Sequence, residues 1–100
     1  MSKNESRRNR VDEVYTEFGD RAKTTAVFVH TQTAPGKSDW INQDRHFLRL
    51  PAVGEYIALS AESPWYRVDL VVHCPFEADY AAEVYATEVD HIEVLKAALA

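Results

Sequence analysis

The residues of this sequence that could do metal or redox chemistry are four histidines and a single cysteine. They are His30, His46, His73, Cys74 and His91. Zinc sites draw ligands from short motifs such as Cys-x-x-Cys or His-Glu-x-x-His, and the sequence contains neither. Adjacent side chains on a strand point to opposite faces, so the neighbours His73 and Cys74 are poorly placed to share an ion. The sequence therefore predicts no metal and no cofactor.

Nucleophilic catalysis would require Cys74 or a serine beside a base. Cys74 is expected to face the core, where a thiol in apolar surroundings is inert. The serines in loops or at strand ends have no nucleophile-elbow context. They are Ser38, Ser60 and Ser63. The sequence offers no catalytic constellation of this kind.

Acid–base catalysis and phosphate binding lack signatures as well. Three carboxylates gather around a predicted hairpin end, which is normally wet, and wet carboxylates make poor general acids at neutral pH. They are Glu77, Asp79 and Glu83. The glycines are isolated, so no glycine-rich phosphate loop is present. We therefore predict that the protein has no catalytic residues and is not an enzyme.

The first segment of the chain is a basic leader, residues 1–5. We expect this leader to be mobile and to contain no secretory signal. Apolar residues then recur at helical spacing, which predicts a helix over residues 6–18. They are Val11, Val14, Tyr15 and Phe18. Because Val14 and Phe18 also fit a two-residue alternation, a strand is the competing interpretation.

Residues 24–89 form the predicted β-sheet core. The expected strands are residues 24–32, 45–50, 55–60, 65–76 and 80–89, divided by turn residues. Residues 90–99 are a predicted helix, with Asp90 as N-cap and Glu93 completing a capping box. Its apolar stripe consists of Ile92, Leu95 and Leu99.

The strand over residues 65–76 has the clearest alternation. Its expected inner face is Tyr66, Val68, Leu70, Val72 and Cys74, and its expected outer face is Trp65, Arg67, Asp69, Val71 and His73. Counting back from the following turn places Val71 beside Tyr85 on the outer face. Val84 and Ala86 of the next strand are expected to face inward.

These elements predict one α+β domain over residues 1–100, a small antiparallel meander of four to five strands with a helix at each end. The Pro-x-x-Gly-Glu step at residues 51–55, followed by Tyr66-Arg67-Val68, resembles small SH3-like β-barrel proteins of uncharacterised bacterial families. The resemblance implies a partly closed barrel, and it carries over no functional residues.

Five large side chains are expected together on the outer face of this sheet. They are Phe47, Tyr56, Trp65, Val71 and Tyr85. Exposed together, they would be a candidate binding face for a protein partner or a second copy of the chain. The alternative is that the terminal helices cover this face, since amphipathic helices need a surface on which to pack.

The chain has a net charge of −5, and its acidic body repels phosphate backbones. Its lone cysteine forms no intramolecular disulfide, and no apolar run is long enough to span a bilayer. We therefore expect a cytoplasmic, non-catalytic binding or accessory module, with protein–protein contact or self-association as its role. A nucleic-acid accessory protein using the basic N-terminus is the first alternative. A small-ligand or enzymatic role near Trp40 and His46, with no visible motif, is the second.

Overall fold

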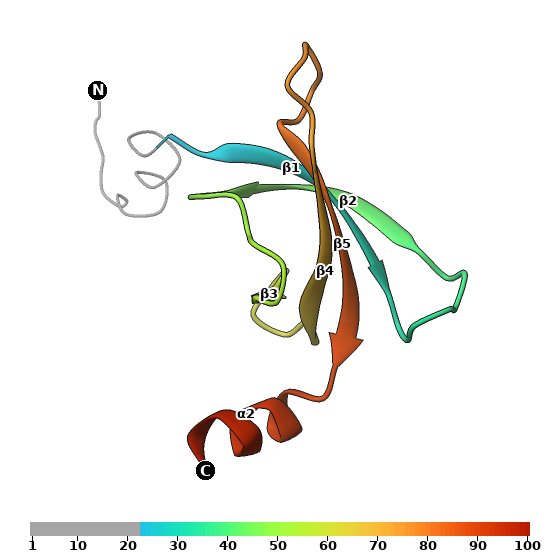
Figure 1. Ribbon diagram of the computed structural model, residues 1–100, viewed down its shortest axis with the longest axis vertical. Coiled ribbons are helices and arrows are strands. Elements are labelled where there is room, and N and C mark those ends of the chain that lie inside the picture. The colour runs from blue at the N-terminus through green and yellow to red at the C-terminus, as the bar shows by residue number, and fades with distance from the viewer. Residues whose placement is uncertain (1–22) are drawn as a thin grey trace.

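The computed structural model describes residues 23–100, which form one curled five-stranded sheet followed by a helix. The elements are β1 (Thr25–Gln32), β2 (Ile41–Phe47), β3 (Tyr56–Ala58), β4 (Trp65–His73), β5 (Ala82–Val89) and α2 (His91–Leu99). The strand order is β2-β1-β5-β4-β3, and the sheet curls into a half-barrel (Figure 1). The predicted leader, residues 1–5, and the predicted helix, residues 6–18, lie outside the described residues.

The sheet is mixed, so the prediction of a purely antiparallel meander is wrong. β5 pairs with β1 in parallel, with Val29 opposite Val84, and the other three pairings are antiparallel. After the β1–β2 hairpin, the chain forms β3 and β4 on the far side of the sheet, and β5 then returns between β4 and β1. The first and last strands therefore lie at the centre of the sheet.

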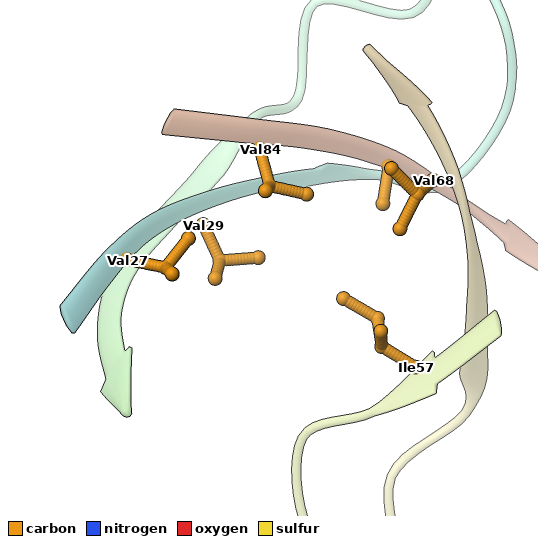
Figure 2. Close-up of a cluster of buried hydrophobic side chains, with 6 residues drawn as sticks. Val27, Val29, Ile57, Val68 and Val84 are labelled. Carbon is orange, nitrogen blue, oxygen red and sulfur yellow. The ribbon is translucent and has the colours of Figure 1, made fainter. Parts of the chain in front are cut away.

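The hydrophobic core occupies the concave inner face of the half-barrel. Figure 2 shows side chains from β1, β3, β4 and β5 directed into this hollow. They are Val27, Val29, Ile57, Val68 and Val84. The predicted inward orientation of Val84 and Ala86 is confirmed, since both are fully buried. The β-branched residues of the central strands suit this packing.

A β-bulge at Asp69 reverses the faces of the second half of β4. Val68 lies opposite Ala86, but the next paired residue is Leu70, opposite Tyr85. Because the extra residue shifts the two-residue alternation, Leu70 and Val72 are exposed on the outer face, whereas Val71 packs against the core. The predicted inward orientation of Leu70 and Val72 is therefore wrong, and so is the placement of Val71 beside Tyr85.

The turn before β3 needs a left-handed residue. Gly54 has a φ of +93°, and its N–H donates to the carbonyl of Val68 at 2.8 Å. This bond extends the β3–β4 pairing beyond the short strand β3. Gly54 thus bends the chain at the Pro-x-x-Gly-Glu step. Strand β2 begins at Ile41 and ends at Phe47, so it starts earlier than the predicted strand over residues 45–50.

Helix α2 begins as the sequence predicts but does not pack on the sheet. The carboxylate of Asp90 accepts a hydrogen bond from the N–H of Ile92 at 3.0 Å, which confirms the N-cap. Glu93 pairs with Lys96 rather than completing a capping box. No residue of α2 is buried, and Figure 1 shows the helix beyond the strand ends. This helix therefore leaves the outer face of the sheet uncovered.

The turn before β3 also contains an ion pair that makes the stability of the fold depend on pH. The guanidinium of Arg49 donates to both Glu55 carboxylate oxygens, at 3.0 and 2.6 Å. The Arg49 hydrogen bond, followed by the N–H of Ala52, lowers the pKa of Glu55 to about 2. Because the pKa of Glu55 is lower in the folded than in the unfolded protein, its ionised carboxylate stabilises the fold at pH values above the unfolded-state pKa. This stabilisation is lost as the pH falls through about 2.

We therefore expect Glu55→Gln to weaken the dependence of the melting temperature on pH between about 4.5 and 2. Thermal melts of both proteins across this range measure the difference. An NMR titration that placed the Glu55 midpoint near its ordinary value would contradict the assigned ion pair.

Candidate binding surface

The structure divides the five residues of the predicted binding face between the two sides of the sheet. Tyr56, Trp65 and Tyr85 lie on the outer face, as the strand register requires. Phe47 and Val71 pack against the core from the inner face. The outer surface is therefore aromatic, as expected, but two of its predicted members do not belong to it.

A hydrogen-bonded histidine lies on the outer face where β2, β1 and β5 run side by side. Nδ1 of His30 is 2.6 Å from Oδ1 of Asn42, and Nε2 is 2.8 Å from Oε1 of Glu83. The strand register brings these side chains together, because His30 is paired with Asn42 on one side and with Tyr85 on the other. With 11% of its side chain exposed, His30 is held by both ring nitrogens.

Aromatic rings surround this histidine. Tyr85 stacks on His30 with ring centroids 4.4 Å apart, and Trp40 meets Tyr85 edge-on at 5.6 Å. Burial and the nearby Glu83 carboxylate raise the pKa of Tyr85. Its hydroxyl donates a hydrogen bond to Glu83 at 3.3 Å. Phe28 also meets the histidine edge-on, with ring centroids 4.7 Å apart. These contacts fix the ring of Tyr85 on the sheet.

Trp40 is positioned by the loop between β1 and β2. The hydroxyl of Thr33 donates to Asp39 at 2.6 Å, and this bond is the main cause that lowers the pKa of Asp39. Gly36, with a φ of +80°, allows the loop to turn. The chain therefore enters β2 with the indole of Trp40 placed against Tyr85.

Beside these rings, the bulge places two aliphatic side chains in solvent. Leu70 is 50% exposed opposite Tyr85, and Val72 is 40% exposed opposite Glu83. Trp40 and Tyr85 lie on the same face, and we call these four side chains the outer patch. Apolar side chains gathered on one exposed face make it a candidate contact surface.

The bulge residue borders the outer patch with a polar network. The carboxylate of Asp69 accepts hydrogen bonds from the hydroxyl of Thr87 at 2.5 Å and from Nε of Arg67 at 3.1 Å. Thr87 is buried under this network. Arg67 and Asp69 therefore close one end of the outer patch, and Glu83 closes the other.

The hydrogen bonds of His30 join three neighbouring strands. Both ring nitrogens of His30 are hydrogen-bonded, so neither has a free lone pair aimed at a substrate. Within residues 23–100, no three histidine, cysteine or acidic residues are grouped to hold a metal ion. The surface offers apolar contact bordered by charges.

A groove of about 480 Å³ opens on the other side of the sheet, between the end of β2 and β3. His46 and the Arg49–Glu55 pair line it, together with Phe47 and Ile57. Trp40 does not line it, since this indole lies against Tyr85 on the outer face. Of the two residues named in the small-ligand hypothesis, His46 therefore lines this groove and Trp40 lies elsewhere.

The sequence did not indicate that His30, Asn42 and Glu83 are neighbours. The alternation of Val27 and Val29 with Phe28 and His30 is a local signal that places His30 on the outer face. Its partner Glu83, however, lies 53 residues away. The parallel pairing of β1 with β5 creates this contact, and no local pattern indicates it.

The fold and this surface define a small half-barrel domain with an apolar, partly aromatic outer face. No family model matches the chain, and no curated protein or solved structure matches it. In the part of the chain that the structure describes, no helix is long and apolar enough to cross a membrane.

Proposed function

We propose that the protein is a non-catalytic binding module that self-associates through the outer patch, with a homodimer as its simplest form. The observation that carries this proposal is the exposure of Leu70 and Val72 beside Tyr85. Full burial of one aliphatic side chain is worth about 1.5–3 kcal/mol, so covering this surface gives a substantial driving force. Large aromatic side chains such as Trp40 are the residues that most often dominate contact energies.

Features of the chain itself favour a second copy as the molecule that covers the outer patch. Besides the outer patch, the chain exposes the apolar stripe of α2, and neither surface covers the other. A closed dimer buries both surfaces twice. The occupied nitrogens of His30 support the non-catalytic part of the proposal.

A relationship to SH3-like barrels and a cytoplasmic location are also proposals. The half-barrel is compatible with the SH3-like barrels that residues 50–57 resemble, and we propose kinship at the level of fold alone. A lone, buried Cys74 suits a reducing cytoplasm.

Leu70→Glu tests the self-association surface. A carboxylate here must be desolvated in the dimer and lies near Glu83, so we expect the dimer dissociation constant to rise at least tenfold, or about 1.4 kcal/mol. Sedimentation equilibrium measures the constant. Val53→Glu, an exposed apolar position in the turn before β3, is the matched control and should leave it unchanged. Equal constants for wild type and Leu70→Glu would remove the outer patch from the interface.

A further inference from the structure

Helix α2 carries an apolar stripe that its own sheet does not cover. Ile92 is 52% exposed, Leu95 38% and Leu99 77%, and they recur at the spacing of one helix face. We propose that α2 of one copy docks on the outer patch of a second copy, and that the exchange is reciprocal. This inference rests on the proposed self-association and names the two elements that meet.

The helix cannot reach the outer patch of its own chain in this structure. The N-cap Asp90 directly follows β5, and α2 leaves the sheet at the end of that strand (Figure 1). Its aromatic contact with the sheet joins His91 to Trp65, with ring centroids 5.2 Å apart. The stripe is therefore displayed beyond the strand ends, where a second molecule can take it up.

The dimensions of the two surfaces match. From Ile92 to Leu99 the helix rises about 10.5 Å, at 1.5 Å per residue. The outer patch extends along β5 from Glu83 to Thr87, which is about 13 Å at 3.3 Å per residue. The whole stripe therefore fits between the charged ends of the outer patch.

The charges at these ends favour one orientation of the helix. The outer patch is bordered by Glu83 at one end and by the ion pair of Arg67 with Asp69 at the other. On α2, Glu93 lies in the first turn and Lys96 follows it toward the C-terminus. A helix oriented with its N-terminus toward the Arg67–Asp69 pair places Lys96 on the side of Glu83, where the contact is attractive. The reversed orientation would place Glu93 on the side of Glu83, where like charges repel.

Two variants and their mixture test the reciprocal exchange. Leu70→Glu introduces a charge into the outer patch and leaves α2 unchanged, whereas Leu95→Glu introduces a charge into the apolar stripe of α2 and leaves the outer patch unchanged. Both positions are exposed, and circular dichroism verifies that each variant is folded. Ala97→Glu, on the opposite side of α2, is the control and should dimerise like the wild type.

Sedimentation equilibrium should give each of the two variants a dissociation constant at least tenfold weaker than that of the wild type. Their equimolar mixture should associate at least tenfold more tightly than either alone, because the heterodimer regains one intact helix–patch contact out of two. A mixture that associates no better than its components would overturn the exchange.

The separate outcomes distinguish the two proposals. If Leu70→Glu weakens the dimer and Leu95→Glu does not, the outer patch is the interface and α2 is not its occupant. If the wild type remains at 11.4 kDa at every concentration, self-association itself is wrong.

Discussion

Val68→Ala is expected to lower the free energy of unfolding by about 2–3 kcal/mol, whereas Leu70→Ala should lower it by less than about 1 kcal/mol. Val68 is 1% exposed in the concave core, so shortening it leaves a cavity. Leu70 has the larger side chain, but the bulge at Asp69 places it in solvent. The smaller truncation should therefore be the more damaging one.

Urea unfolding of both variants measures this difference. A strand with unbroken alternation would bury Val68 and Leu70 alike and would make the two costs similar. A cost for Leu70→Ala equal to or above that for Val68→Ala would show that β4 has no bulge at Asp69.

His30→Ala is expected to destabilise the fold by about 2–4 kcal/mol. The substitution leaves the half-buried carboxylate of Glu83 without its partner, at about 1–3 kcal/mol, whereas the exposed Asn42 regains water. It also removes the ring that stacks on Tyr85, worth about 0.5–1.5 kcal/mol for a pair of this kind.

The matched control is His46→Ala. His46 is an exposed histidine whose single side-chain hydrogen bond within residues 23–100 is with Thr24 at 3.3 Å. Its loss should change stability by no more than about 0.5 kcal/mol. Equal effects of the two substitutions in thermal or urea unfolding would mean that the His30 hydrogen bonds do not hold the strands together.

Local sequence patterns predicted the approximate strands in residues 23–100, although β2 begins at Ile41, before the predicted strand over residues 45–50. Alternating apolar residues indicated the strands, and the inward orientations of Val84 and Ala86 followed from parity. Asp90 signalled the start of α2 because an N-cap is recognised by the chemistry of one residue. These are interactions between near neighbours in the chain, which a single sequence displays.

The remaining features depend on pairings between distant residues. One inserted residue, Asp69, reverses the faces of the rest of β4, and aspartate in a strand does not by itself signal a bulge. The β1–β5 pairing brings Glu83 to His30, and only the tertiary fold determines that pairing. The predicted surface consequently retained Tyr85 but included Val71 in place of Leu70.

The central claim is that the outer patch is covered by a second copy, and the fluorescence of Trp40 tests it most directly. The chain has two tryptophans, so Trp65→Phe leaves Trp40, which is 39% exposed in the single chain, as the only indole. Iodide quenching of this variant should weaken as the protein concentration rises and the mass doubles. Quenching that stays constant while the mass doubles would place the interface elsewhere, and a mass that never doubles would contradict self-association.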